Sequence, residues 1–415
     1  MKILILSLEY SPGASGGVGT HVQELSTGLA RAGDSVTVLA GTVGRQERHV
    51  EGRKTVHLVP PDKNQKPGTS ITQGILDYNS VLASYARRII LPEQGAPDLI
   101  HCHNWITYPA AADLARTLGI PTITTVHYVS EPAERWWGQT PDPEILAQEG
   151  LLFRQQSQFI AVSGSIQSLM REGYSVPEES VEVIYNAVEP ASFLPASLPV
   201  GYLDRLRASV APSGEKIVLY TGRFHPMKGI SAMLKSAILV LQHEPNVRYL
   251  MAGEPDSQAF ALEFREHIDR NPILQEKLTV LGKLSRQRVA MLYSLADLAL
   301  LPSVYDPCPY AAIEAMAAGV PLVASDGGGL AELVEHEVNG LAVPVRIGEA
   351  GMRSVNPEEL AQATMRLLRD DDLARRLGEG ARQIAAEKYN MEVMIRSTRT
   401  VYQGVMSRNH VHAIP

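Results

Sequence analysis

The sequence is poor in cysteine, and its basic residues are outnumbered by its acidic ones. Only two of its 415 residues are cysteines, Cys102 and Cys308. Two cysteines cannot build a disulfide framework, so we expect a protein of a reducing compartment, the cytoplasm. The 38 Lys and Arg residues face 45 Asp and Glu residues, and the resulting net charge of −7 has the wrong sign for nucleic acid. We therefore expect no nucleic-acid partner.

Long apolar runs are missing as well. No stretch reaches the ~18 apolar residues that a membrane-spanning helix needs. The opening MKILILSLEY is broken by Glu9 before the apolar core of a signal peptide develops, and we interpret it as a buried strand. Lys63, Lys66, Arg87 and Arg88 are too few and too scattered to form a basic membrane-binding surface. We expect no integral membrane segment.

Short β-branched runs alternate with longer amphipathic ones along the whole chain. This alternation predicts an α/β fold, in which helices cover both faces of a parallel sheet. Proline and glycine cluster in residues 190–214, where we place a domain boundary. We expect two doubly wound domains, 1–198 and 199–387, and a C-terminal helix and tail, 388–415. The predicted strands are 3–8, 36–39, 98–102, 122–126, 158–162 and 181–185 in the first domain, and 217–221, 247–252, 278–282, 298–301 and 321–324 in the second.

Ligands of such sheets bind at the carboxyl ends of the strands, and two facing sheets would leave a cleft between them. Gly13, Gly16, Gly17 and Gly19 follow the first predicted strand, where backbone amides can approach a ligand closely. A plain tight turn is the alternative. NAD binding is disfavoured, because no acidic residue closes the next strand.

Two cations lie in the segment TGRFHPMKG, where Arg223 follows a predicted strand and Lys228 precedes a helix. A diphosphate presents two adjacent charges and suits such a pair. A solvated basic loop is the alternative for these two residues taken alone.

Two carboxylates follow later, Asp306 in a loop and Glu314 in a helix that begins near Pro309. Carboxylates accept hydrogen bonds from sugar and ribose hydroxyls, and the helix N-terminus can face a phosphate. The small residues after Glu314 also suit close packing on a strand. The acidic run at 369–376, RDDDLARR, resembles a metal cluster, but we interpret it as the N-cap and first turn of a helix.

His127 ends the predicted strand 122–126, where it can donate to a sugar hydroxyl. A structural role is the alternative for a lone histidine. His101, His103 and His127 also raise the question of zinc, but no cysteine or carboxylate stands nearby at ligand spacing, and we expect no metal.

In order along the chain stand the motifs EYSPGASGGVGTHVQELSTGLARAG, HCHNWIT, TTVH, VIYNAVEP, TGRFHPMKG, DPCPYAAIEAMAAGVP and SDGGGLAEL. With them the chain resembles the retaining family 4 glycosyltransferases, including glycogen and starch synthases, over nearly its whole length. The resemblance implies a GT-B fold of two Rossmann-like domains, with the last helix crossing back to the first domain.

The resemblance also implies residue roles. Arg223 and Lys228 would hold the donor diphosphate and Glu314 the ribose hydroxyls, while His127 would contact the transferred sugar. Gly17 and its neighbours would close over the phosphates. The backbone amides of Cys308 and Tyr310 would meet the sugar.

Two positions depart from the family's usual residues. Asp306 stands where glutamate is usual, so its reach to the donor sugar is one methylene shorter. Pro309 stands where many members have glycine, and it has no amide to donate. The expected donor is a UDP-sugar, with GDP- and ADP-sugars as alternatives, and no cofactor is implied.

The acceptor is expected to bind in the N-terminal domain, because sugars and cyclitols bind through aromatic stacking and polar contacts. The candidates there are Tyr10, Asn104, Trp105, Glu131, Trp136 and Trp137. Four alternatives remain open: a glycoside phosphorylase, a sugar-nucleotide epimerase, a non-catalytic nucleotide-sugar-binding protein and a dehydrogenase.

Overall fold

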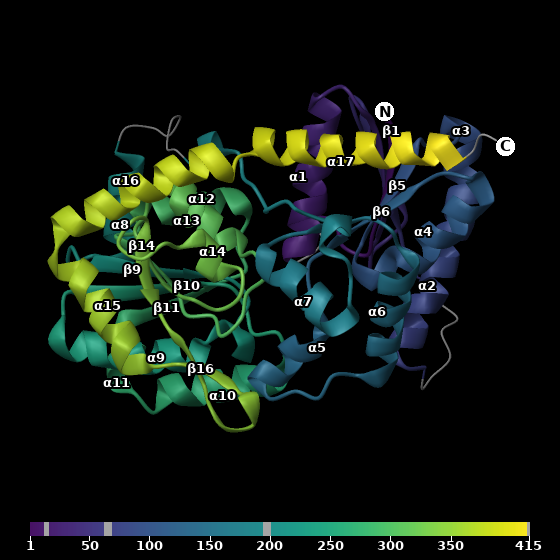
Figure 1. Cartoon of the computed structure of the whole chain (residues 1–415). Helices are drawn as coiled ribbons and strands as arrows, with labels where there is room; N and C mark the ends of the chain where they lie inside the picture. The colour runs from purple at the N-terminus through teal and green to yellow at the C-terminus, as the bar shows by residue number, and fades with distance from the viewer. Residues whose placement is uncertain (12–15, 62–68, 194–200, 413–415) are drawn as a thin grey trace. The chain divides into compact units, whose positions relative to one another are not determined.

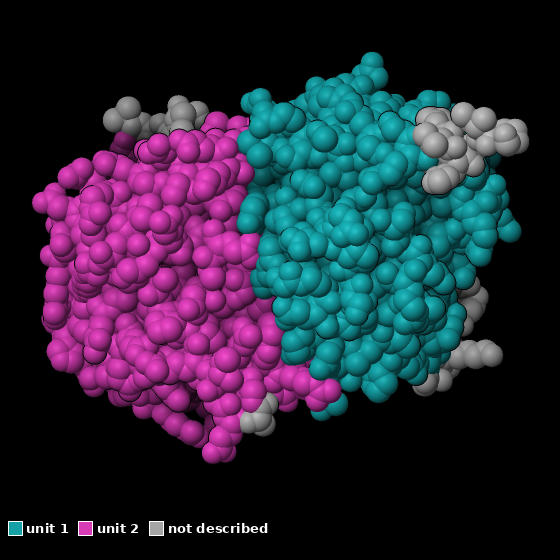
Figure 2. All heavy atoms as spheres, viewed as in Figure 1, with its two compact units in different colours: residues 1–132, 140–187, 391–415 teal, residues 133–139, 188–390 magenta. Residues whose placement is uncertain are grey.

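Each half of the chain folds around its own parallel sheet. The computed structural model describes residues 1–11, 16–61, 69–193 and 201–412. Unit 1 comprises Met1–Pro132, Thr140–Ala187 and Met391–Pro415, and unit 2 comprises Ala133–Gln139 and Val188–Asn390 (Figure 2). The chain thus passes between the units after residues 187 and 390, near the boundaries at 198 and 387 proposed from the sequence. The segment Ala133–Gln139 departs from this simple sequential division.

Unit 1 is built on an eight-stranded sheet in the order β3-β4-β2-β1-β5-β6-β7-β8. Neighbouring strands are parallel, apart from the antiparallel hairpin of β3 and β4. In the central strand β1 (Lys2–Ser7), residues 3–6 are all buried, so both faces of the sheet are covered. The remaining strands are β2 (Ser35–Gly41), β3 (Glu47–Glu51), β4 (Lys54–Val59), β5 (Leu99–His103), β6 (Thr122–Val126), β7 (Phe159–Ala161) and β8 (Val181–Val183).

The last helix of the chain, α17 (Met391–His412), belongs to unit 1, as the resemblance implied. It crosses α1 (Gly17–Arg31) (Figure 1). Its residues Ile395 and Tyr402 share an apolar cluster with Leu25 of α1. Gly28 permits this approach, because a Cβ there would lie 2.5 Å from Ile395 Cγ1. The other helices of unit 1 are α2 (Ile71–Tyr85), α3 (Leu91–Gln94), α4 (Asn104–Leu118), α5 (Ser130–Ala133), α6 (Pro143–Gln155) and α7 (Gly164–Tyr174), with a π-turn at Ala86–Ile90 and a 3-10 turn at Glu178–Ser180.

Unit 2 is built on a six-stranded parallel sheet in the order β11-β10-β9-β12-β13-β14. Its strands are β9 (Lys216–Thr221), β10 (Val247–Ala252), β11 (Leu278–Gly282), β12 (Leu298–Leu301), β13 (Leu322–Ser325) and β14 (Gly340–Val343), and a separate hairpin is formed by β15 (Val345–Ile347) and β16 (Arg353–Val355). Its helices are α8 (Tyr202–Val210), α9 (Ile230–His243), α10 (Gln258–Asp269), α11 (Pro272–Lys277), α12 (Arg286–Leu295), α13 (Tyr310–Ala318), α14 (Leu330–Leu333), α15 (Pro357–Arg369) and α16 (Asp371–Lys388), with 3-10 turns at Glu134–Trp137, Pro190–Phe193, Pro226–Lys228 and Glu349–Gly351.

The predicted α/β class and two-sheet architecture are confirmed, and each predicted strand overlaps an observed one. The acidic run at 369–376 forms a helix start, as interpreted: Asp370 is the N-cap of α16, and its carboxylate accepts from Leu373 N at 2.9 Å. The structure adds strands that the sequence did not indicate, β3, β4, β14 and the β15–β16 hairpin. Every residue of β3 is exposed, so this strand has no apolar alternation to detect.

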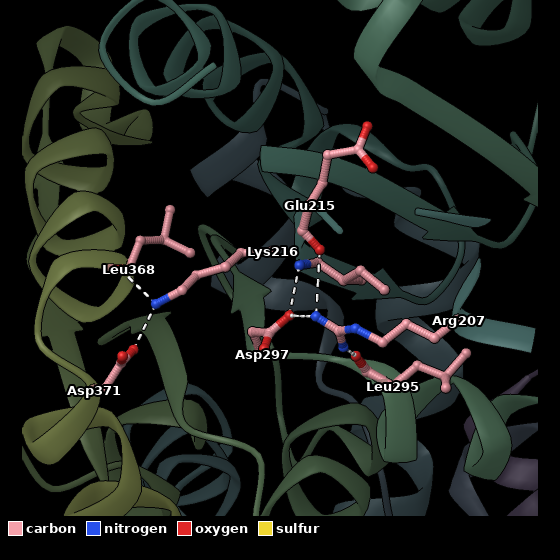
Figure 3. Close-up of polar contacts among 8 residues, drawn as sticks. Arg207, Glu215, Lys216, Leu295, Asp297, Leu368 and Asp371 are labelled. Carbon is pink, nitrogen blue, oxygen red and sulfur yellow. Dashed lines mark hydrogen bonds and ion pairs between the residues drawn. The ribbon is translucent and has the colours of Figure 1, made fainter. Parts of the chain in front are cut away.

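A polar network fixes the start of β9, the strand that leads to the predicted cations (Figure 3). Asp297 Oδ2 accepts from Arg207 Nη2 and from Ile217 N, both at 2.7 Å. Arg207 also donates to the carbonyl oxygen of Leu295 at 2.5 Å. Nearby, Lys216 Nζ donates to Asp371, whose side chain is 86% exposed. The Asp297 side chain is the more enclosed of the two acceptors, at 33% exposure.

We predict that Asp297→Ala lowers the free energy of unfolding by about 1–3 kcal/mol, because Arg207 and the amide of Ile217 lose their shared acceptor. The matched variant Asp371→Ala removes an exposed ion pair and should change it by less than about 1 kcal/mol. Urea unfolding of both variants checks this. Equal losses would show that the Asp297 network does not stabilise β9 specifically.

Candidate functional site

The loop between β9 and α9 carries both predicted cations, and hydrogen bonds from within the loop shape it. The Tyr220 hydroxyl donates to the carbonyl oxygen of Arg223 at 2.8 Å, and Met227 N donates to His225 Nδ1 at 3.0 Å. Lys228 ends the 3-10 turn that follows, and the Arg223 side chain is exposed. The loop lies at the carboxyl end of β9, the edge at which α/β sheets bind ligands.

This loop also lies directly against the chain that follows β12. Val304 N donates to the carbonyl oxygen of Met227 at 2.8 Å. Gly229 has φ +67°, and a Cβ there would lie 1.9 Å from the carbonyl oxygen of Pro302. Glycine is therefore required here for both its backbone conformation and the close approach.

Lys228 and Asp306 meet as a result of that approach. Lys228 Nζ lies 2.5 Å from Asp306 Oδ2, and the two side chains are 18% and 8% exposed. The backbone of Asp306 is held in turn, since its N donates to the carbonyl oxygen of Gly327 at 3.1 Å. An ammonium has three donors, so Lys228 can bind an anion while it remains paired with Asp306.

The glycines of the segment SDGGGLAEL make room for the loop that carries Asp306. A Cβ at Gly327 would lie 2.5 Å from the carbonyl oxygen of Ser303. A Cβ at Gly328 would lie 2.6 Å from the ring of Tyr305. These glycines thus let the loops after β12 and β13 pack against each other.

Glu314 projects from α13, the helix that begins after Pro309, as predicted. Its Oε1 lies 3.7 Å from Arg286 Nε, and the residue is 8% exposed. Burial raises the pKa of Glu314, and the charge of Arg286 opposes that rise. The Arg286 guanidinium lies 5.7 Å from the ring centroid of Phe193.

The start of α13 offers backbone donors near these side chains. Its N-cap, Pro309, provides no side-chain hydrogen bond to the helix. Tyr310 is the first helical residue, and burial raises the pKa of its hydroxyl, while the charge of Arg286 opposes that rise. Cys308 directly precedes the N-cap, and Glu314 follows Tyr310 by about one turn of α13.

Two tryptophans pack against the cation loop and the Asp306 loop within unit 2. The Trp136 ring makes an edge contact with Tyr305 at 4.9 Å, and the Arg353 guanidinium lies 3.5 Å from its centroid. Trp137 makes an edge contact with His225 at 4.6 Å. The sequence analysis placed both tryptophans in the N-terminal domain, whereas Ala133–Gln139 belongs to unit 2.

Unit 1 gathers four histidines at the carboxyl ends of β5 and β6 and on α1. His103 Nδ1 lies 3.0 Å from His127 Nε2, and the rings of His101 and His103 are stacked with centroids 4.6 Å apart. His21 of α1 contacts His127 edge-on at 4.7 Å, and its Nδ1 lies 2.9 Å from Asn186 Oδ1. His127, at 8% exposure, is the least buried of the four.

Burial keeps these imidazoles neutral. It lowers the pKa of His21 to about 4, with the Asn186 bond opposing, and that of His101 to about 3. Burial and the neighbouring imidazoles lower the pKa of His103 and His127 well below the usual range. The cluster therefore contributes hydrogen-bonding groups without charge at neutral pH.

Three histidines of this cluster lie close enough together to be possible metal ligands. One ligand atom each from His21, His103 and His127 lies within 4.8 Å of the others. Within the described part of the chain, His21 Nε2 and His103 Nε2 are buried without a hydrogen-bond partner. Three neutral imidazoles are a ligand set that zinc accepts, but a zinc ion would have to compete with the His103–His127 hydrogen bond.

The comparisons with known proteins identify the family. Residues 15–192 match the family model described as Glycosyltransferase Family 4, and residues 204–384 match that of Glycosyl transferases group 1. The chain belongs to the family 4 glycosyltransferases. It therefore transfers a sugar from a nucleotide-sugar donor.

Relatives of this glycosyltransferase match over nearly its full length. An uncharacterized glycosyltransferase of Methanocaldococcus jannaschii, MJ1607, is 29% identical over 98% of this chain and 99% of its own. Sucrose-phosphate synthase of Thermosynechococcus elongatus has TM-score 0.81 at 22% identity, covering 98% of this chain and 99% of that one. Anabaena Alr3699/HepE, solved with UDP-glucose, has TM-score 0.76 at 19% identity, covering 97% and 100%. These structural likenesses confirm the GT-B fold.

Several predicted acceptor residues of the glycosyltransferase have structural partners of their own. Asn104 Oδ1 accepts from His127 N at 2.7 Å, so this side chain holds the end of β6. Trp105 is 6% exposed in the core, and Tyr10 packs against the apolar cluster of unit 1. The carbonyl oxygen of Glu131 lies against Gly173, 3.6 Å from where a Cβ there would lie.

Gly17 is the first residue of α1 rather than part of the loop before it, and Gly13 lies outside the described residues. Among the described helices, none combines the length and apolar character needed to cross a membrane.

Two polar residues of the site were missed by the sequence analysis. His21 joins the histidine cluster. Glu9 lies against Gly16 at the start of α1, and within the described residues its buried Oε2 has no hydrogen-bond partner. Only Glu9 had a local signal, a carboxylate directly after a buried strand.

We predict that Gly229→Ala weakens nucleotide binding at least about tenfold, because the new Cβ clashes with Pro302 and displaces the cation loop. Gly214→Ala is the matched control. Its φ of +74° imposes similar backbone strain, but a Cβ there has nothing within 4 Å. Calorimetric titration with nucleoside diphosphates checks both variants, and equal affinities would show that the close approach is not needed.

We also predict that the free energy of unfolding decreases as the pH falls below about 6.5. An unfolded histidine binds a proton there, whereas folded His21 and His101 bind one only near pH 4 and pH 3. The unfolded state then carries more protons, which costs about 2 kcal/mol per buried histidine at pH 5. Urea unfolding at pH 7.5 and 5.0 should show a smaller loss for His21→Gln than for wild type or for the exposed-site variant His243→Gln. An unchanged loss in His21→Gln would contradict this.

Proposed function

We propose that this glycosyltransferase moves a hexosyl or amino-hexosyl group from a UDP-sugar to a hydroxyl of a sugar, polyol or cyclitol. Transfer retains the anomeric configuration and needs no metal ion. The observation that carries this proposal is the pairing of Lys228 with Asp306 beside the exposed Arg223, at the carboxyl edge of the unit 2 sheet. The UDP-glucose in the Anabaena structure supports the choice of donor, with GDP- and ADP-sugars as alternatives.

We assign the two cations, Arg223 and Lys228, to the negative charge that develops on the leaving group. When the bond between the sugar C1 and the diphosphate oxygen breaks, negative charge develops on the leaving nucleoside diphosphate. Arg223 offers a planar fork for phosphate oxygens, and Lys228 offers a point charge already held in place by Asp306. Together they supply the positive charge that a divalent cation supplies in other transferases.

The carboxylates would position the donor. Asp306 Oδ2 receives Lys228, and we assign its other oxygen to a hydroxyl of the transferred sugar. We assign Glu314 to the ribose hydroxyls, with Arg286 favouring its charged form despite burial. The backbone amides near Cys308 and Tyr310 would face the sugar and phosphates.

The chemical step exchanges one C1–O bond for another on the same face of the sugar. The bond to the diphosphate breaks with its electron pair going to the phosphate oxygen, and the acceptor oxygen bonds to C1. The leaving phosphate takes the proton of the acceptor hydroxyl, so no protein carboxylate acts as nucleophile. We assign His127 to a hydroxyl of the transferred sugar, because a neutral imidazole bonds a hydroxyl without opposing the positive charge on the ring.

We predict that Lys228→Ala lowers kcat by a factor of about 100 or more with the fold intact, because charge on the leaving group is then left uncompensated. The matched control is Lys216→Ala, which removes a lysine paired with an exposed aspartate at the opposite end of β9. Steady-state transfer assays and circular dichroism check both variants. Near-normal turnover in Lys228→Ala would remove this lysine from the mechanism.

The assay should first be run with a panel of nucleotide sugars, with and without EDTA. Unchanged transfer in EDTA supports the metal-independent mechanism, and loss that added zinc restores would point instead to the three histidines of unit 1. Glycoside cleavage that requires inorganic phosphate would identify a phosphorylase, and binding without turnover would identify a non-catalytic protein.

A further inference from the structure

The last helix of the chain reaches the histidine cluster through one hydroxyl group. Tyr402 of α17 is 0% exposed, and its hydroxyl oxygen lies 2.6 Å from His101 Nδ1. The two residues are separated by 301 positions in the sequence. His101 Nε2 lies 2.7 Å from Thr125 Oγ1, so both nitrogens of this ring are engaged. The ring is thus held from α17 on one side and from β6 on the other.

Hydrogen-bond accounting assigns the direction of both bonds. Among the described residues, His101 is the only hydrogen-bond partner of the Tyr402 hydroxyl, and burial raises the pKa of that hydroxyl well above its usual range. The Tyr402 hydroxyl therefore keeps its proton. This proton has no acceptor unless His101 Nδ1 accepts its hydrogen bond. Tyr402 then donates to His101 Nδ1, and His101 carries its own proton on Nε2 and donates to Thr125. Tyr402 selects this tautomer.

His101 is connected to His127 by two routes. Thr125 precedes His127 by two residues on β6 and its continuation, so the bond from His101 fixes the backbone that presents His127. The His101 ring also stacks on His103 at an interplanar angle of 29°, and His103 Nδ1 lies 3.0 Å from His127 Nε2. A ring rotation at His101 would disturb both routes.

We propose that Tyr402 is a positioning residue for the transfer reaction: its hydroxyl fixes the tautomer and orientation of His101 and thereby the orientation of His127. The docking of α17 on α1 and the geometry of the sugar-contacting histidine are then coupled. This inference rests on the role assigned to His127 in the proposed function. It adds a residue from the C-terminal helix to the catalytic apparatus without placing it in contact with substrate.

Tyr402→Phe is the direct test, because it removes one oxygen and keeps the ring in the core. We expect kcat to fall by about tenfold, because His127 would no longer be held in its orientation. The dissociation constant for the nucleoside diphosphate should stay within about twofold, since its proposed contacts lie in unit 2.

The chain offers a matched control in Tyr85, whose hydroxyl lies 3.1 Å from His57 Nδ1 in the same unit. Tyr85→Phe breaks the same kind of bond away from His127 and should leave kcat unchanged. An equal loss of kcat in both variants would show a general effect of destabilisation and overturn the proposal.

A double-mutant cycle separates positioning from stability. If Tyr402 acts through His127, the effect of Tyr402→Phe on kcat should disappear in a His127→Ala background. A loss of the same factor in both backgrounds would overturn the proposal. Urea unfolding of each variant shows whether the fold is retained.

Nitrogen-15 NMR of histidine-labelled protein tests the network independently of turnover. The wild-type protein should show His101 as the Nε2–H tautomer, and Tyr402→Phe, unlike Tyr85→Phe, should shift the ring resonances of His127. Unchanged His127 resonances in Tyr402→Phe would overturn the proposal. If the wild type transfers no sugar to any acceptor, the proposed function fails instead, and the NMR result still decides the network.

Discussion

The ion pair between Lys228 and Asp306 is the contact on which the site in unit 2 depends. Burying two opposite charges gains little stability by itself, because their desolvation cost offsets their attraction. The pair is formed because β9 and β12 are neighbours and Gly229 lets the two following loops approach closely. The result is a lysine whose charge is oriented before any ligand binds. In the proposed function, such preorganisation would reduce the cost of binding a diphosphate and of stabilising it as it leaves.

Much of this site was predictable from the sequence, because parallel strands bring their carboxyl ends to one edge. Arg223, Lys228 and Asp306 each follow a recognisable buried strand, and their nearness follows from the sheet. The contact of Arg286 with Glu314 was not predictable, since it depends on how the start of α12 faces α13. The fold class was predictable because buried strands leave an apolar pattern in the sequence. Strand β3 was not predictable, because a fully exposed strand leaves no such pattern.

Residues that are distant in the sequence meet at the sites of both units, and nearness in the sequence does not predict these tertiary contacts. Trp136 stands nine residues after His127, yet Tyr305 and Arg353 hold it in unit 2. His21 and Tyr402 lie far from β5 and β6 in the sequence, and they reach the histidines there because α1 and α17 pack on the sheet of unit 1. No local motif contains these contacts. They depend on helix packing, including the space that Gly28 leaves for Ile395.

The proposed reaction develops negative charge on the leaving group and positive charge on the sugar, and each unit is assigned to one of these charges. In the proposed function, Arg223 and Lys228 would bind a group that becomes more negative as the bond to the sugar breaks. His127 would contact a sugar that becomes more positive, and a protonated imidazole would oppose that reaction. Burial of the whole cluster keeps His127 neutral, and each additional imidazole strengthens that effect by disfavouring a second charge. The four buried histidines lower the stability of the fold at acidic pH, and together they keep His127 a neutral hydrogen-bonding group.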